Sequence, residues 1–175
     1  MTISFMVVGG PRSATTWVAN LLTTDTTLCL HDPLLEHTSK QLENAHFPGK
    51  RVGIADTSAI MWPEWIAVHP AKKVVLWREV SEINVSLRAL GLPEMDAVSH
   101  YRRLSMLSHI PVLPWQAVFT PLGAMRLCKL LDVPFDRYRF EELVKMNIQP
   151  QFSRLPVSKE AAQELVRRIQ KELAS

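Results

Sequence analysis

The sequence predicts an α/β protein: a parallel β-sheet between two layers of helices, forming one three-layer α/β/α domain over residues 1–175. Short apolar runs alternate with segments of helical periodicity, which is the pattern of strands joined by crossover helices. The two clearest runs, residues 3–8 and 73–77, are largely apolar, as buried parallel strands are. The 175 residues, 47% hydrophobic and 21% charged, suffice for one such domain and leave little room for a second.

The predicted elements follow this alternation. Strands are expected over residues 3–8, 28–30, 52–55, 73–77 and 111–120. Helices are expected over residues 15–22, 35–44, 58–68, 80–90, 93–108, 121–131, 135–147 and 158–173. Gly91 ends one helix, and Pro121 stands where the first turn of another tolerates proline. Because ligands of parallel sheets bind at the carboxyl ends of strands, a site is expected in the polar clusters that follow the two clearest strands.

Composition disfavours several other classes. A formal net charge of +3 is too small to indicate a nucleic-acid-binding protein, but it suits an anionic small ligand if the cations cluster. Cys29 and Cys128 have neither disulfide-framework nor metal-ligand spacing, so we expect buried thiols in a reducing cytoplasm. No apolar run is long enough to span a bilayer, and the N-terminal run lacks a basic leader. We therefore expect a cytoplasmic protein with no membrane partner, and its oligomeric state stays open.

The first polar cluster, Gly-Gly-Pro-Arg-Ser-Ala-Thr-Thr-Trp at residues 9–17, joins the first strand to the first helix. At such a turn several backbone N–H groups and the positive end of the helix dipole converge, which favours binding of phosphate or sulfate. Arg12 adds a permanent cation with forked donors. Ser13, Thr15 and Thr16 add hydroxyl donors. The cluster therefore predicts an anion-binding loop.

The cluster has two other interpretations. Ala14 and Thr15 occupy the places where a Walker A loop needs glycine and lysine, so an ordinary nucleoside-triphosphate-binding loop is disfavoured. The cluster is alternatively a plain surface turn in which Ser13 or Thr15 caps the helix.

Residues 11–17 resemble the phosphosulfate-binding loop of the sulfotransferase superfamily, which follows the first strand and reads Pro-(Lys or Arg)-Ser-Gly-Thr-Thr-Trp. Six of the seven positions match, and the arginine variant is common in small bacterial or phage-type members. The resemblance implies a P-loop-like loop that binds the cofactor 3′-phosphoadenosine-5′-phosphosulfate (PAPS) through Pro11, Arg12, Ser13, Ala14, Thr15, Thr16 and Trp17. Ala14 departs from the glycine of the motif, which would weaken cofactor binding if only glycine accepts the backbone conformation there. Trp17 is expected either to stack on the adenine or to pack in the core.

A second motif of that family lies after a later strand, where an arginine and a serine eight residues on bind the 3′-phosphate of the cofactor. Arg78 ends the predicted strand 73–77, and Ser86 stands in the next helix at that spacing. The resemblance therefore implies that Arg78 and Ser86 are cofactor-binding residues. The alternative is that Arg78 pairs with Glu79 or Glu82 and that Ser86 is an ordinary helix residue.

The resemblance implies sulfuryl transfer to a hydroxyl or amine without a metal, releasing adenosine 3′,5′-bisphosphate (PAP). Arg12 would stabilise the charge that grows on the leaving phosphate, and a general base would take the proton of the acceptor. His31 and Asp32 are the best-placed candidates for the base, because they end the second strand, which should flank the loop. Glu36 and Asp56 are further candidates, and a turn or cap role is the alternative for each.

The acceptor, a small molecule or a glycan, lies beyond what the sequence predicts. Trp62 and Trp65 either line its pocket or belong to the core. The late Arg-Lys-Gly cofactor loop of cytosolic eukaryotic members is not visible, and Arg102 and Arg103 are candidate substitutes. Two other functions stay open: a catalytically weak or inactive module that binds PAP or PAPS, and a P-loop kinase of nonstandard type. The other histidines, His100 among them, are expected to be surface or satisfied core residues.

Overall fold

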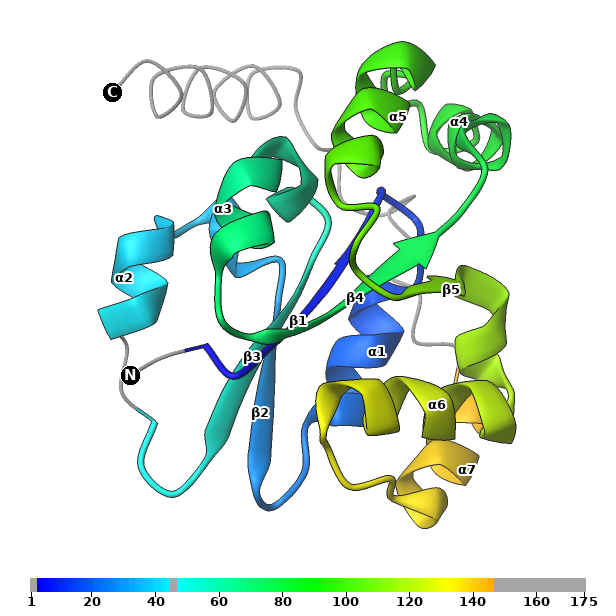
Figure 1. Cartoon of the computed structure of the whole chain (residues 1–175). Helices are drawn as coiled ribbons and strands as arrows, with labels where there is room; N and C mark the ends of the chain where they lie inside the picture. The colour runs from blue at the N-terminus through cyan, green and yellow to red at the C-terminus, as the bar shows by residue number, and fades with distance from the viewer. Residues whose placement is uncertain (1–2, 45–46, 147–175) are drawn as a thin grey trace.

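The computed structural model describes residues 3–44 and 47–146. Its centre is a five-stranded sheet in the order β2-β3-β1-β4-β5, with every neighbouring pair parallel (Figure 1). The strands are β1 (Phe5–Gly9), β2 (Thr27–His31), β3 (Arg51–Asp56), β4 (Lys72–Trp77) and β5 (Val112–Pro114). Strand β1 lies in the middle, and Val7 is in register with Ala55 on one side and Val74 on the other.

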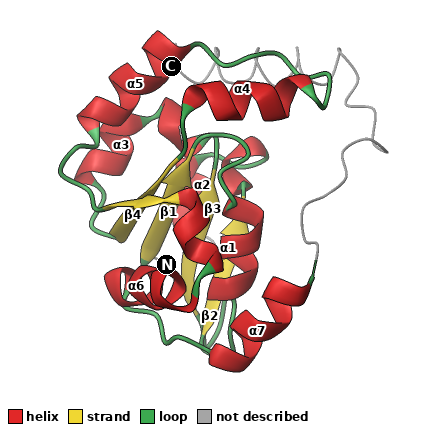
Figure 2. Cartoon of the chain, turned by 90° about the vertical axis from the view of Figure 1, so that its right-hand side faces the viewer, coloured by secondary structure: helices red, strands yellow, loops and turns green. Residues whose placement is uncertain are grey.

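Helices cover both faces of this sheet (Figures 1 and 2). One face carries α1 (Thr15–Leu22), α6 (Pro121–Leu131), α7 (Arg137–Lys145) and the 3₁₀ helix η3 (Trp115–Phe119). The other face carries α2 (Ser39–Asn44), α3 (Pro63–Val68), α5 (Ala97–Met106) and the 3₁₀ helices η1 (Pro33–Leu35) and η2 (Ala59–Met61). Helix α4 (Val80–Arg88) crosses the end of the sheet at which β4 finishes (Figure 2).

The core is divided by the sheet into two apolar clusters. Along β1, Phe5 and Val7 belong to the cluster under α1 and α6, whereas Met6 and Val8 belong to the cluster under α3 and α5. All four side chains are fully buried. Alternate residues of a strand point to opposite faces, so a strand buried on both faces must be apolar throughout. The structure confirms the predicted α/β architecture, a parallel sheet with helices on both faces.

Several helix boundaries differ from the predicted ones because caps and prolines set them. The helix expected from residue 93 begins only at Ala97, where Asp96 accepts a hydrogen bond of 2.8 Å from the Ser99 N–H. The helix expected over 58–68 is divided into η2 and α3, with Pro63 opening the second piece.

Other predicted elements shift or change type. The strand expected over 111–120 is wrong beyond Pro114: β5 has three residues, and a 3₁₀ turn follows that buries Val118. The helix expected over 35–44 forms only in its second half, after a 3₁₀ turn that starts at Pro33. The helix expected over 158–173 lies outside the described residues.

Both cysteines are buried, as the sequence predicts. Burial raises the pKa of Cys29 well above its ordinary range and that of Cys128 to about 11. Both thiols therefore stay protonated at neutral pH.

Candidate functional site

The loop between β1 and α1 lies close to α4 and α5 at Gly10. A Cβ atom on Gly10 would lie 2.9 Å from Cδ1 of Ile83 and 3.1 Å from Cε1 of His100. The first distance is shorter than real Cβ contacts and the second is tighter than most, so a side chain at residue 10 would require the Ile83 and His100 side chains to shift. Glycine at residue 10 thus permits the close approach of both helices to the loop.

Left-handed backbone conformations gather around this loop. Among the described residues, four non-glycine residues have positive φ: Arg12 (63°), Ala14 (65°), Asp32 (45°) and Asp132 (56°). Asp132 terminates α6, which is a common place for such a residue. The other three lie in the loop or at the end of β2. A left-handed L-residue costs about 1–2 kcal/mol, and such strain concentrates at functional sites.

Helix α1 begins without a side-chain cap. Its N-cap is Ala14, which has no side chain that could accept a hydrogen bond from the first turn. The first intrahelical bond is donated by the Val18 N–H to the Ala14 carbonyl at 2.9 Å. The N–H groups of Thr15, Thr16 and Trp17 precede that bond and have no acceptor within the helix. In contrast, side chains cap α5, α6 and α7.

The structure brings the second predicted motif against this loop. Arg78 Nη1 donates to the Arg12 carbonyl, and Arg12 Nε donates to Ser86 Oγ at 3.0 Å. Burial and, secondarily, the neighbouring Arg78 guanidinium lower the pKa of Arg12. Arg12, Arg78 and Ser86, contributed by two segments more than 60 residues apart, are therefore linked by hydrogen bonds at the carboxyl ends of β1 and β4.

Arg78 also has partners on its other side. Its Nε lies 3.4 Å from Oε2 of Glu82, and its guanidinium carbon lies 4.1 Å from the centroid of the Trp115 ring. Glu82 accepts a further hydrogen bond from Trp115 Nε1 at 3.3 Å. Pairing with Glu82 was the alternative weighed from the sequence, and it coexists with the contact to the loop. Glu82 holds the guanidinium in place and also competes with any anion that approaches it.

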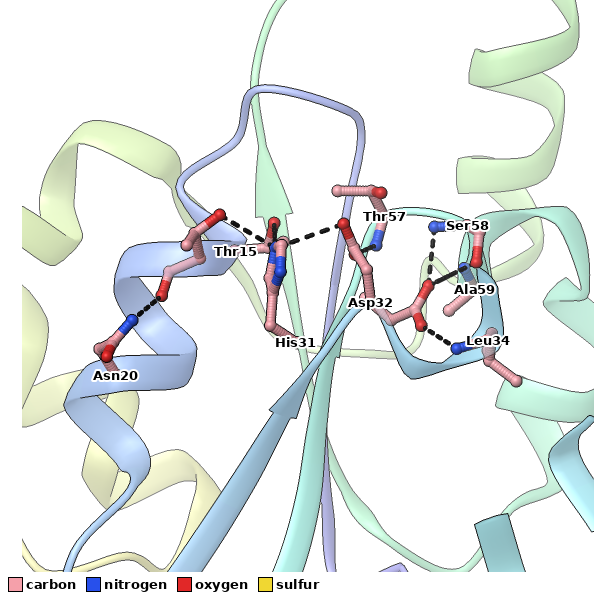
Figure 3. A network of polar contacts seen from close by, with 10 residues as sticks. Thr15, Asn20, His31, Asp32, Leu34, Thr57, Ser58 and Ala59 are labelled. Atoms are coloured by element: carbon pink, nitrogen blue, oxygen red, sulfur yellow. Dashed lines mark hydrogen bonds and ion pairs between the residues drawn. The ribbon is translucent and has the colours of Figure 1, made fainter. Parts of the chain in front are cut away.

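His31 and Asp32 lie on the opposite side of the loop, at the end of β2 (Figure 3). His31 Nε2 lies 3.0 Å from Thr16 Oγ1, 3.4 Å from Thr15 Oγ1 and 3.3 Å from Asp32 Oδ2. Asp32 is anchored in turn by the Thr57 N–H, which donates to its Oδ1 at 2.6 Å. Burial raises the pKa of Asp32, and the contacts with His31 and Thr57 oppose this rise. The histidine thus joins the start of α1 to the end of β2.

Asp56 has a structural role in the described region, which corrects its candidacy as the base. Its side chain is fully buried and accepts hydrogen bonds at 2.7–2.9 Å from Leu34, Ser58 and Ala59 (Figure 3). Asp56 therefore ties the turn after β3 to η1, which positions Asp32. A carboxylate enclosed in this way has no access to a substrate.

Trp17 takes the core role of its two predicted roles. Its indole is 5% exposed and meets Phe119 and Phe140 edge-on at centroid distances of 5.0 and 5.8 Å. Its Nε1 donates to the Leu143 carbonyl at 3.4 Å. A ring enclosed by α7 and η3 cannot stack on an adenine, so this predicted cofactor contact is corrected.

Trp62 and Trp65 are partly buried and pack against the apolar cluster under α3 and α5. Trp65 Nε1 also donates to Glu43 Oε1 at 3.3 Å. A role of these two side chains in an acceptor pocket stays a prediction.

A surface pocket of about 390 Å³ adjoins His31 and Asp32. Leu30, Leu42 and Phe47 supply apolar lining, and Glu36, His37 and Gln41 supply polar lining. Glu36, a further candidate for the base, is therefore placed at this pocket. The volume lies within the range of small-molecule sites.

His100 is buried beside the loop, in agreement with the core role that was one of its two expected roles. Its ring is 4% exposed, lies against Gly10 of the loop and belongs to α5. Burial and the Arg103 charge lower its pKa, so the imidazole is neutral at pH 7. The sequence spacing indicates that His100 is buried, because it shares one helix face with Leu104 and Leu107. Arg102, the other candidate substitute for the late cofactor loop, is exposed on the same helix as Arg103.

Within the described ranges, no helix combines the length and apolarity that a membrane crossing requires. The same residues contain no group of three His, Cys, Asp or Glu side chains that could hold a metal ion. In comparisons with known proteins, no family model matches the chain, and no curated protein is significantly similar to it.

Proposed function

We propose that this protein is a sulfotransferase that moves a sulfuryl group from PAPS to the hydroxyl or amine of an acceptor. The observation that carries the proposal is the meeting of its two motifs: Arg78 donates to the Arg12 carbonyl, and Arg12 donates to Ser86. Each motif alone is weak. Their convergence at the carboxyl end of a parallel sheet is what a donor with phosphate groups at both ends requires.

The residues present fit an anionic donor. The uncapped start of α1 offers N–H groups, and the helix dipole adds partial positive charge at that point. Ser13 Oγ is buried and has no hydrogen-bond partner among the described residues. A hydroxyl group of the loop is therefore left to form a hydrogen bond with a ligand. The Arg78 charge lowers the pKa of Arg12, second to burial, so a bound anion would stabilise both guanidinium groups in addition to the contact that Glu82 already makes with Arg78. PAPS would supply an activated sulfuryl group on a good leaving phosphate.

In the proposed transfer, Arg12, His31 and Asp32 have distinct roles. The acceptor oxygen forms a bond to sulfur, the bond from sulfur to the bridging phosphate oxygen breaks, and PAP leaves. Arg12 stabilises the negative charge that grows on that oxygen. His31 takes the proton of the acceptor, and the Asp32 carboxylate, 3.3 Å from Nε2, orients the ring and stabilises the imidazolium that forms.

A second candidate, a nucleotide-binding module without turnover, is favoured by one observation. Trp17 is buried in the core and cannot provide the adenine contact that the resemblance implies. Such a module would keep the phosphate contacts and lack productive placement of the donor. No observation favours the nonstandard kinase.

The test is transfer of labelled sulfate from PAPS to a panel of hydroxyl and amine acceptors, with labelled ATP in parallel. Transfer from PAPS and none from ATP is expected. Arg12→Ala should abolish turnover, and Arg78→Ala should mainly weaken donor binding. Arg88→Ala is the matched control, because Arg88 lies on the same helix as Ser86 and pairs with Glu94 on the surface. PAP binding without transfer to any acceptor would support the binding module instead.

A further inference from the structure

The pocket beside His31 differs in charge from the loop that it adjoins. Asp32 and Glu36 contribute carboxyl groups to its lining, and no lysine or arginine is found among the described residues that line it. On the other side of the loop, Arg12 and Arg78 contribute two permanent cations. The pocket lining therefore carries two carboxyl groups and two histidines, whereas the other side of the loop carries two guanidinium groups, one of which pairs with Glu82.

His31 lies at the boundary between these halves. Its Nε2 contacts both hydroxyls at the start of α1, and its ring also lines the pocket. A molecule seated in the pocket therefore lies next to the side chain that contacts the anion-binding loop. His31 thus links the pocket to the loop.

The lining determines what kind of molecule fits. Leu30, Leu42 and Phe47 offer an apolar surface, and burying apolar groups of a ligand there is favourable. A second anion would be repelled by the carboxylates, whereas an ammonium group would be attracted. We propose that the pocket binds an acceptor with an apolar body that is uncharged or carries an ammonium group, and that it rejects anionic acceptors. The proposal that this molecule is an acceptor rests on the proposed function, which supplies the sulfuryl donor at the loop. The charge preference of the pocket depends only on the residues that line it.

The test uses three probes of one shape: tyramine, para-propylphenol and para-hydroxyphenylpropionate. Their side chains end in an ammonium, a methyl and a carboxylate group. Each is titrated into the full chain without nucleotide, at low salt and about pH 8, where imidazole is ordinarily neutral. Backbone amide chemical shifts report both the affinity and the location of binding. Tyramine and para-propylphenol should shift amides of η1, α2 and the end of β2, and the carboxylate probe should bind at least about tenfold more weakly than tyramine.

Matched variants separate charge from shape. Glu36→Gln keeps the size of the side chain and should reduce the tenfold ratio to about threefold or less, because one carboxylate is lost. Glu64→Gln, an equal change on α3 outside the pocket lining, should leave the ratio unchanged. Equal or tighter binding of the carboxylate probe, binding elsewhere, or no binding of any probe would each overturn the proposal. Failure of the proposed function has a different signature: PAP would not bind, while tyramine would still shift the pocket amides.

Discussion

Replacing Ala14 by glycine tests whether the loop stores backbone strain. Ala14 has φ 65° and ψ 18°, a left-handed conformation that costs an L-residue about 1–2 kcal/mol. Glycine removes that cost. It also adds about 0.5–1 kcal/mol of chain entropy to be lost on folding and deletes a methyl group worth about 0.8 kcal/mol when buried. Ala14 is only 8% exposed, so the methyl contribution applies in full. The opposing contributions nearly cancel, and Ala14→Gly should change the free energy of unfolding by less than about 1 kcal/mol.

A matched substitution isolates the strain. Ala19 is 4% exposed in the interior of α1, so Ala19→Gly has the same entropy and methyl penalties with no strain to relieve. Ala14→Gly should therefore be more stable than Ala19→Gly by about 1–2 kcal/mol, or roughly 2–8 °C in melting temperature for a chain of this size. Urea unfolding of both variants measures the difference, with equal m-values as the check on two-state behaviour. Equal destabilisation by the two substitutions would refute the claim that Ala14 is strained.

Two further predictions concern charged groups of the site. Glu82→Gln should raise the affinity for PAP about threefold or more in calorimetry, because the amide oxygen still accepts a hydrogen bond from Trp115 but no longer competes with the nucleotide for Arg78. The control Glu94→Gln, remote from the loop, should leave the affinity for PAP unchanged. An unchanged affinity in Glu82→Gln would contradict competition between Glu82 and the nucleotide. Burial raises the pKa of Asp32 in the folded state, so the folded protein binds the proton of this carboxyl group more tightly than the unfolded chain does. The stability that this proton contributes is therefore lost as the pH rises through the folded-state pKa. Urea unfolding from about pH 4 upward should therefore show Asp32→Asn gaining stability relative to wild type, and a constant difference across the series would contradict the raised pKa.

The sequence was informative wherever local chemistry decides the structure. Strands β1 and β4 are apolar because both of their faces are covered, and polar residues at their carboxyl ends necessarily lie at one edge of the sheet. The departure of Ala14 from glycine raised the question of whether the loop could form. The structure answers that Ala14 adopts the left-handed conformation itself.

Features that depend on distant packing could not be predicted in the same way. Trp17 is a core residue because Phe140, more than 100 residues later, closes over its ring. The apolar run after residue 111 has the same pattern for a strand and for a 3₁₀ turn, and only the placement of Val118 beneath the sheet distinguishes them. The pocket beside His31 is formed by α2 and η1 together, and no local pattern indicates that they enclose a space.

The proposed function requires Arg12 and Arg78 to form one anion site for a nucleotide with phosphates at both its 3′ and 5′ positions. This is measured by calorimetric titration of the full chain with PAP and with adenosine 5′-monophosphate. PAP should bind at least about tenfold more tightly, and Arg78→Ala should abolish that preference while weakening the monophosphate far less. Equal affinity for the two nucleotides in the wild-type protein, or tighter binding of the monophosphate, would contradict a shared site for both phosphates.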